Sequence, residues 1–267
     1  MAFLAIDKET CTKCGLCATQ CSIVYFREGS FPRQLPVGED ACMQCGHCVA
    51  ICPTGSLTHK AMPETPRLEK LLDVTFEQCA QLIRGRRSIR NFQDREVSRD
   101  VIESVLDVAR YSPTGHNFQD LKWLVINSQD KIKEIKAIGA EWLRYRARTS
   151  PEFAEMFAPM IKKLDAGEET FLQGAPAAVL TYNSKHNLVS NADCVIAMSY
   201  FNLAADAAGL GCCWAGLLMN AAATYPDMIE AIGLPEGATA YAALMVGYPV
   251  YRYTWVPARR SAQVTWM

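Results

Sequence analysis

The sequence has almost no net charge and no apolar run long enough to cross a membrane. Its 27 Lys and Arg residues against 28 Asp and Glu residues leave a formal net charge of −1, so no overall field favours nucleic acid or a membrane surface. The most apolar region, residues 194–219, is interrupted by Asn202 and Asp206, which excludes a membrane span there. The opening M-A-F-L-A-I-D is too short for a signal sequence. We therefore expect a cytoplasmic protein without nucleic-acid or membrane partners.

Cysteine, in contrast, is abundant, with 12 residues in a chain of 267. Eight of them form two runs with the spacing C-x2-C-x2-C-x3-C, which begin at Cys11 and at Cys42. This spacing suits cubane iron–sulfur clusters, because three thiolates of a run wrap one cluster and the fourth reaches the other. We predict two [4Fe–4S] clusters, one held by Cys11, Cys14, Cys17 and Cys52 and the other by Cys42, Cys45, Cys48 and Cys21.

Zinc knuckles or a disulfide framework are the alternatives for these cysteines. Zinc sites usually pair two C-x2-C units, and a fourth Cys at x3 is unusual for them. Disulfides need an oxidising compartment, for which the sequence gives no sign. The pattern resembles a bacterial two-cluster ferredoxin over residues 1–60, although Ser22 follows Cys21 where Pro53 follows Cys52. The remaining cysteines, which we expect to be small buried hydrophobic residues, are Cys79, Cys194, Cys212 and Cys213.

After residue 60 the sequence predicts a linker and then alternating helices and strands. Two prolines in A-M-P-E-T-P-R-L favour a linker, which we assign to residues 61–74. The predicted strands cover residues 122–127, 176–182 and 241–246. The predicted helices cover residues 75–85, 98–111, 130–165 and 191–208, and a short one begins at Pro226. This alternation predicts a layered α/β or α+β domain over residues 75–267.

The segment R-R-S-I-R, residues 86–90, is the first candidate for a second binding site. Arg86, Arg87 and Arg90 place three cations around the hydroxyl of Ser88. Such a set can bind a phosphate through charge-assisted hydrogen bonds, in which each guanidinium offers a planar fork. The alternative is a solvated basic end of a helix.

Two other segments carry groups that suit a flavin. Y-S-P-T-G-H-N-F-Q, residues 111–119, breaks a helix and presents Asn117 and Gln119, whose carboxamides can donate and accept at once. G-L-G-C-C-W-A-G-L, residues 209–217, reads as a Gly-rich turn whose backbone N–H groups can approach a planar ligand. Each segment alone is a weak signal, because Gly-rich turns and Asn loops are common.

Together and in this order, these segments resemble the nitroreductase family of FMN enzymes over residues 75–267. The segments G-Y-P at 247–249 and V-P-A-R-R at 256–260 resemble it too. The resemblance implies an α+β fold, a layered α/β/α flavin domain behind a small ferredoxin-like iron–sulfur domain. It also implies an intertwined homodimer with FMN at its interface. One departure is that D-L-K-W follows Gln119, where the family often has Pro-Trp.

The resemblance also assigns roles to individual residues. The FMN phosphate would be held by Arg86, Arg87, Ser88 and Arg90, with Arg259 or Arg260 closing on it from the tail. The isoalloxazine ring would be contacted by Asn117 and Gln119, and its reactive N5 by the backbone of Gly216 and Leu217. Leu217 stands where a second small residue is frequent in the family. The aromatic and Met residues of the 130–165 region are expected to be core, with a lid over the flavin as the alternative.

These assignments predict an oxidoreductase without a catalytic side chain. Electrons from an external donor would pass through the clusters to FMN and on to a nitroaromatic, quinone or enone. In the alternative, NAD(P)H would reduce FMN and the clusters would pass electrons to a ferredoxin-like carrier. A redox sensor without a substrate is the third hypothesis. The sequence names neither the donor nor the substrate.

Overall fold

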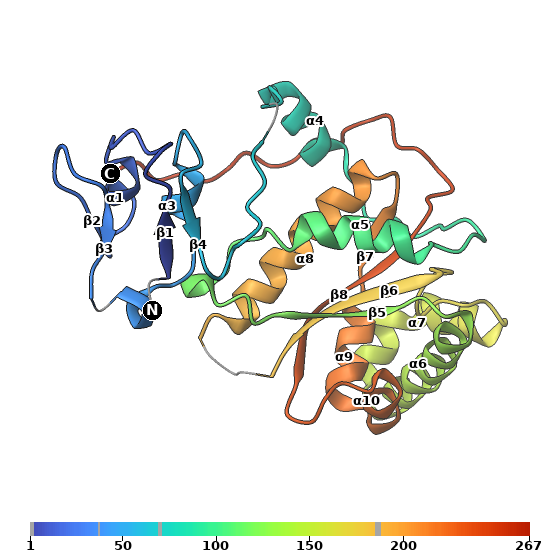
Figure 1. Ribbon diagram of the computed structural model, residues 1–267. Helices are drawn as coiled ribbons and strands as arrows, with labels where there is room; N and C mark the ends of the chain where they lie inside the picture. The colour runs from blue at the N-terminus through green and yellow to red at the C-terminus, as the bar shows by residue number, and fades with distance from the viewer. Residues whose placement is uncertain (1–2, 37, 69–70, 185–187) are drawn as a thin grey trace. The chain divides into compact units, whose positions relative to one another are not determined.

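The computed structural model of the chain describes residues 3–36, 38–68, 71–184 and 188–267 (Figure 1). Its contacts divide the chain into two units. Residues Met1–Asp73 and His116–Phe118 form the smaller unit, and Val74–Gly115 and Gln119–Met267 form the larger one. Within the described ranges, no helix combines the length and the apolar character that a membrane crossing requires.

The smaller unit consists of short strand pairs and one-turn helices. β1 (Leu4–Ile6) pairs antiparallel with β4 (Leu57–His59), and β2 (Val24–Tyr25) pairs antiparallel with β3 (Arg33–Gln34). The helices are α1 (Leu16–Thr19), α2 (Gly38–Ala41) and α3 (His47–Ala50). The buried core mixes apolar side chains with thiols and contains Phe3, Leu4, Cys17, Val24, Cys48, Val49 and Leu57. Because so small a core buries little apolar surface, such a unit needs additional stabilisation, which bound metal can provide.

The doubled cysteine motif forms the same backbone twice. The second residue after each first Cys is left-handed, with φ 54° at Lys13 and 50° at Gln44. The Gly after each second Cys is also left-handed, with φ 75° and ψ −2° at Gly15 and φ 74° and ψ −2° at Gly46. Glycine tolerates this conformation without steric cost. α1 and α3 each begin at the next residue, so the repeat in the sequence is also a structural repeat.

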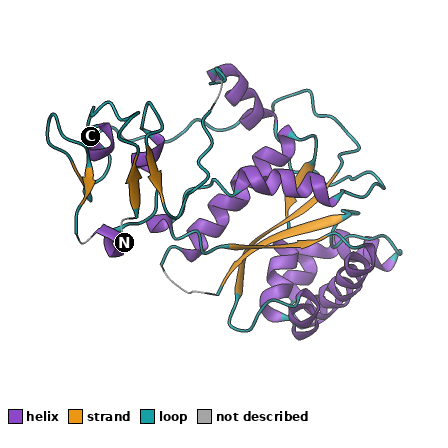
Figure 2. Ribbon diagram, in the orientation of Figure 1, coloured by secondary structure: helices purple, strands orange, loops and turns teal. Residues whose placement is uncertain are grey.

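A four-stranded antiparallel sheet forms the centre of the larger unit (Figure 2). Its strands are β5 (Lys122–Ile126), β6 (Ala177–Asn183), β7 (Gly211–Trp214) and β8 (Thr239–Gly247). They lie in the order β5-β6-β8-β7, so β6 and β8 are central and β7 is an edge strand. All three predicted strands are present, whereas β7 lies in the region that the sequence predicted as a Gly-rich turn.

Helices cover both faces of this sheet and make three layers (Figure 1). One face carries α5 (Arg99–Ala109) and α8 (Ser190–Ala207), and α4 (Phe76–Gly85) contacts α8. The other face carries α6 (Gln129–Thr149), α7 (Pro151–Asp165), α9 (Gly216–Thr224) and α10 (Pro226–Ile232). Alternate strand residues enter different cores: Val179 and Leu244 pack with α5 and α8, while Leu180 and Met245 pack with α6 and α9. The predicted α+β layered fold is confirmed.

Local capping explains where several helices begin and end. The Thr75 hydroxyl accepts the N–H of Gln78 at 3.2 Å, and the Gln78 side chain accepts the N–H of Thr75 at 3.0 Å, a capping box that begins α4. Pro226 stands at the start of α10, and Gly233 ends it with φ 65°. Pro151 likewise divides the predicted 130–165 region into α6 and α7.

Two expectations about buried residues are confirmed in part. Trp142 and Phe153 belong to the buried core beneath the sheet, with Phe157 and Met160 packed against it, as expected for core rather than lid residues. Tyr145, in contrast, is 46% exposed. Cys194, Cys212 and Cys213 are buried, whereas Cys79 is exposed on α4 and the expectation for it was wrong.

Gly139 offers a direct test of the packing between α6 and Phe171. A Cβ at Gly139 would overlap the Phe171 ring, which is buried, so Gly139→Ala should lower the free energy of unfolding by about 1–3 kcal/mol. Gly85→Ala, also in a helix but with open space around it, is the control and should be neutral or slightly stabilising. Thermal melts followed by circular dichroism measure both. Equal melting temperatures for the two variants would contradict the packing.

Candidate functional site

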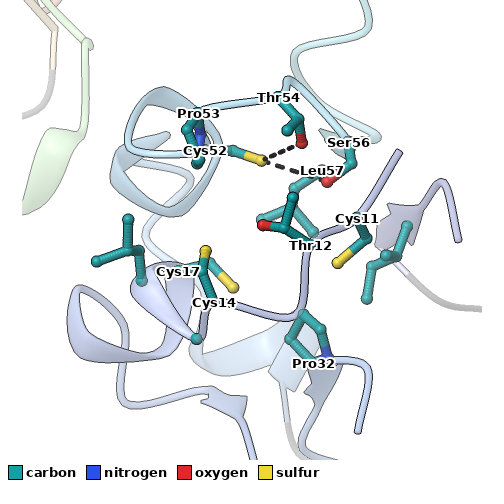
Figure 3. Close-up of a pocket in the computed structure, with 13 residues that line it drawn as sticks. Cys11, Thr12, Cys14, Cys17, Pro32, Cys52, Pro53, Thr54, Ser56 and Leu57 are labelled. Carbon is teal, nitrogen blue, oxygen red and sulfur yellow. Dashed lines mark hydrogen bonds between the residues drawn. The ribbon is translucent and has the colours of Figure 1, made fainter. Parts of the chain in front are cut away.

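Four predicted cluster ligands line one cavity in the smaller unit (Figure 3). Cys11, Cys14, Cys17 and Cys52 face it, and apolar walls come from residues such as Pro32 and Leu57. These four thiols come from both runs, as the crossed assignment requires. Soft thiolates in an apolar wall suit an iron–sulfur cluster better than a hard cation.

The surroundings of the Cys52 thiol stabilise its thiolate form. Its Sγ lies 3.3 Å from the Ser56 hydroxyl and 3.7 Å from the Thr54 hydroxyl (Figure 3). Burial raises the pKa of Cys52, but these hydroxyls and nearby backbone N–H groups outweigh burial and lower the pKa to about 7. Because a cluster binds thiolate, these hydrogen bonds favour the ligating form.

The second set of thiols gathers around Cys48. Burial, and then repulsion from Cys21, Cys45 and Cys42, raises the pKa of Cys48 to about 11. The backbone N–H of Gln44 donates to Cys42 Sγ at 3.4 Å. Within the described part of the chain, no three His, Cys, Asp or Glu side chains are grouped to hold a single metal ion. The ligands of a cubane cluster need not approach a single point as those of one metal ion do, because each thiolate binds a separate corner.

One histidine in this unit was missed at the sequence level. His47, between two predicted ligands, is exposed. His59 is buried instead, with Nε2 3.5 Å from Cys42 Sγ. The cysteine spacing gives no sign of this contact, because His59 lies outside both motifs.

Asn117 makes different contacts from those predicted for a flavin ligand. It belongs to the smaller unit, where its Nδ2 donates to the carbonyls of Met43 at 3.1 Å and Gln44 at 3.0 Å, between Cys42 and Cys45. Asn117 has φ 55°, which asparagine tolerates better than most residues. Gln119, in the larger unit, is exposed, and its N–H donates to the Thr114 hydroxyl at 3.1 Å.

The predicted phosphate segment lies along the edge strand of the sheet. Ser88 bridges Cys212 in parallel, and the N–H of Ile89 donates to the Cys212 carbonyl at 3.0 Å. A Cβ at Gly211 would meet the Ile89 side chain at 2.5 Å, so only glycine fits at this approach. The structure therefore brings residues 86–90 and 209–217 together.

The segment G-Y-P holds the other end of this stretch. The N–H of Gln93 donates to the Tyr248 carbonyl at 2.8 Å, and the N–H of Val250 donates to the Asn91 carbonyl at 3.0 Å. Phe92 and Pro249 form an antiparallel bridge. The stretch from Ile89 to Gln93 is thereby fixed to the sheet at both ends.

The arginines of the segment have different environments. The Arg87 guanidinium donates to the carbonyls of Arg84 and, at 3.2 Å, Gly85, at the end of α4. Arg86 acts electrostatically on Asp206 of α8: burial raises the pKa of Asp206, and the positive charge of Arg86 opposes that rise. Arg90 is exposed. Arg86 and Arg90 therefore suit an anion better than Arg87 does.

Gly216 and Leu217 begin α9, directly after β7. Ala215 precedes them and has no capping side chain, so the first-turn N–H groups lack a side-chain acceptor. A Cβ at Gly216 would meet nothing within 4 Å, so the space beside it is open. Arg259 and Arg260 lie on the exposed tail that follows β8. An uncapped helix start with open space fits the predicted contact between backbone N–H groups and a planar acceptor.

Comparison with known proteins decides the family. Residues 83–248, more than half of the chain, match the model of the nitroreductase family. The chain belongs to the nitroreductase family. This membership makes it an oxidoreductase, as predicted. Residues 3–53 match the model of a 4Fe–4S dicluster domain, which agrees with the two predicted clusters.

Other proteins are similar to this chain in sequence or in structure. A protein from Methanothermobacter thermautotrophicus, provisionally named an NADH dehydrogenase/NAD(P)H nitroreductase, is 26% identical over 63% of this chain and 76% of its own. An FMN reductase (NADPH) from Bacillus subtilis is 22% identical over 63% of this chain and 65% of its own. A nitroreductase from Bacteroides fragilis, solved with bound FMN, has a TM-score of 0.58 at 18% identity and covers 70% of this chain and 97% of its own. This last likeness confirms the predicted fold.

Removal of one thiol tests the crossed assignment. Cys48→Ala should disturb the cluster of Cys42, Cys45, Cys48 and Cys21, so that iron and acid-labile sulfide fall while the EPR signal of the other cluster persists. Cys194→Ala makes the same change at a buried thiol of the larger unit and is the control. Unchanged iron and sulfide in the Cys48 variant would overturn the assignment.

Proposed function

We propose that this chain is an FMN-dependent oxidoreductase that passes electrons from an external donor through two [4Fe–4S] clusters to an electrophilic organic substrate. The observation that carries the proposal is the presence in one chain of a 4Fe–4S dicluster match and a nitroreductase match. When bound, the clusters supply one-electron steps and the flavin converts single electrons into a pair. Nitroaromatics, quinones and enones are the substrate classes that accept such a pair.

The eight motif cysteines are the proposed cluster ligands. Cys11, Cys14, Cys17 and Cys52 line a common cavity, and the thiols of Cys21, Cys42 and Cys45 contribute to raising the pKa of Cys48. Asn117 is proposed to hold the loop between Cys42 and Cys45 rather than to contact the flavin, because its Nδ2 donates to the carbonyls of Met43 and Gln44 in that loop. Gln119 remains the proposed carboxamide contact to the flavin ring.

Arg86, Ser88 and Arg90 are the proposed ligands of the FMN phosphate. The pairing of Ile89 with Cys212 fixes the backbone of this segment, so its cations are held at a defined edge of the sheet. Arg86 acts electrostatically on the partly buried side chain of Asp206, whose pKa its positive charge lowers against the effect of burial. The first-turn N–H groups of Gly216 and Leu217 are proposed to face the flavin ring. The chemistry needs no acid or base side chain under this assignment.

The exposed tail supports the proposal of a homodimer. Residues 251–267 are exposed along their whole length, and Trp255 and Trp266 are 87% and 90% exposed. Phe76 on α4 is 76% exposed. Large apolar side chains with such high exposed fractions indicate a surface that a partner covers. In a homodimer the tail would lie on the second copy and bring Arg259 or Arg260 to a phosphate.

A nicotinamide donor is the second candidate function. Relatives named NAD(P)H nitroreductase and FMN reductase (NADPH) favour it. In this arrangement NAD(P)H would reduce the flavin and the cysteine-rich unit would deliver electrons to a ferredoxin-like carrier. A redox sensor without turnover is the third possibility, and a cytoplasmic location remains a prediction.

Replacing the arginines tests the proposed phosphate site. Arg86→Ala and Arg90→Ala should each weaken FMN binding by about 10–100-fold, because each removes a charge-assisted bond of about 1.5–3 kcal/mol. The flavin-to-protein ratio after gel filtration and the Kd from fluorescence titration measure this, and the iron content should stay unchanged. Arg87→Ala, which removes bonds to the end of α4, is the control and should retain FMN. A double Arg86/Arg90 variant that keeps the wild-type flavin-to-protein ratio would contradict the assignment of the phosphate site.

A further inference from the structure

We propose that His59 donates a hydrogen bond from Nε2 to the Cys42 thiolate and thereby raises the reduction potential of the second cluster. The inference rests on the proposed ligation of that cluster by Cys42. His59 does not contact the reacting atoms of a substrate, so it is a positioning residue that acts through the thiolate. Each cluster then has a hydrogen-bond donor of its own kind, in a unit whose two binding motifs have the same backbone.

The hydrogen bonds of the imidazole fix its tautomer. The backbone N–H of Ala61 donates to His59 Nδ1 at 3.0 Å, so this nitrogen is an acceptor. In a neutral imidazole the other nitrogen then carries the proton. That nitrogen, Nε2, lies 3.5 Å from Cys42 Sγ, a normal distance for a hydrogen bond to sulfur. The N–H therefore points at the thiolate.

The ring is held in place from several sides. His59 is 4% exposed and ends β4, where it pairs with Leu4 of β1. The Phe3 ring packs against it with centroids 5.2 Å apart and planes tilted by 59°. His59 also bridges Met62 in the following turn. The strand pairing and the bridge fix the His59 backbone, while burial, the Phe3 ring and the Ala61 N–H on Nδ1 hold the imidazole, which leaves it little freedom to turn its N–H away from Cys42.

A donor to a ligand thiolate favours the reduced cluster. Reduction adds one negative charge, part of which lies on the ligand sulfurs, and a nearby N–H stabilises that charge. Partners that orient or polarise a metal ligand tune the metal in this way. In the first set the hydroxyls of Ser56 and Thr54 lie against Cys52, the last thiol of its run. The donor and the thiol that receives it therefore differ between the two clusters.

Redox titration of the holoprotein with EPR detection tests the proposal. His59→Asn moves the amide donor toward the position of Nδ1 and out of reach of Cys42, whereas His59→Gln keeps a donor near the position of Nε2. We expect His59→Asn to reduce the equilibrium constant for reduction of one cluster about tenfold, which is about 59 mV for a one-electron couple. His59→Gln should stay near the wild type. Ser56→Ala, which removes the nearer hydroxyl from Cys52, should shift the other cluster instead.

Iron and sulfide content separate this proposal from the cluster assignment itself. If His59→Asn keeps both clusters and leaves both potentials unchanged, the role of His59 is overturned while the ligand assignment stands. A shift of the same cluster by His59→Asn and Ser56→Ala also overturns it. If Cys42→Ala keeps full iron and sulfide, the underlying ligation is wrong instead. A lower potential of one cluster in His59→Asn, with a potential near that of the wild type in His59→Gln, supports the proposal.

Discussion

The position of β8 between β6 and β7 is the constraint on which the larger unit depends. β8 is buried on both faces and pairs with a neighbour on each side. On one side it holds β7, whose Cys212 carbonyl accepts the N–H of Ile89. Beyond its C-terminal end, Tyr248 bonds to Gln93. One central strand thus fixes the stretch from Ile89 to Gln93, which follows the first arginines of the segment, and α9 begins one residue after β7. A shift in the register of β8 would move all these groups together.

The smaller unit depends on a different constraint, the repeated left-handed glycines that turn each cysteine run. Gly15 and Gly46 give both motifs the same backbone, and the surroundings of the thiols then make them unequal. Hydroxyls lower the pKa of Cys52, while burial and neighbouring thiols raise the pKa of Cys48.

Short-range patterns predicted most of the fold and the proposed ligand sets. The cysteine spacing works because each motif folds locally, and Pro226 and Gly233 mark the ends of a helix within eight residues. β7 was not predicted, because Gly211 and two small thiols carry little strand propensity and the strand is stabilised by its pairing with β8. His59 and Asn117 were placed by long-range contacts, which no local pattern encodes. The bonds of the Arg87 guanidinium to the end of α4 could likewise not be predicted, because the sequence does not distinguish Arg87 from Arg86 and Arg90.

The most direct test of the account is the order of reduction under anaerobic conditions. The purified protein would be mixed with reduced ferredoxin, NADH or NADPH, with flavin absorbance and cluster EPR followed in time. The account predicts that ferredoxin reduces the clusters first and the flavin next, while the nicotinamides do neither. Flavin bleaching by a nicotinamide before any cluster signal develops would contradict it and would make the cysteine-rich unit the outlet for electrons.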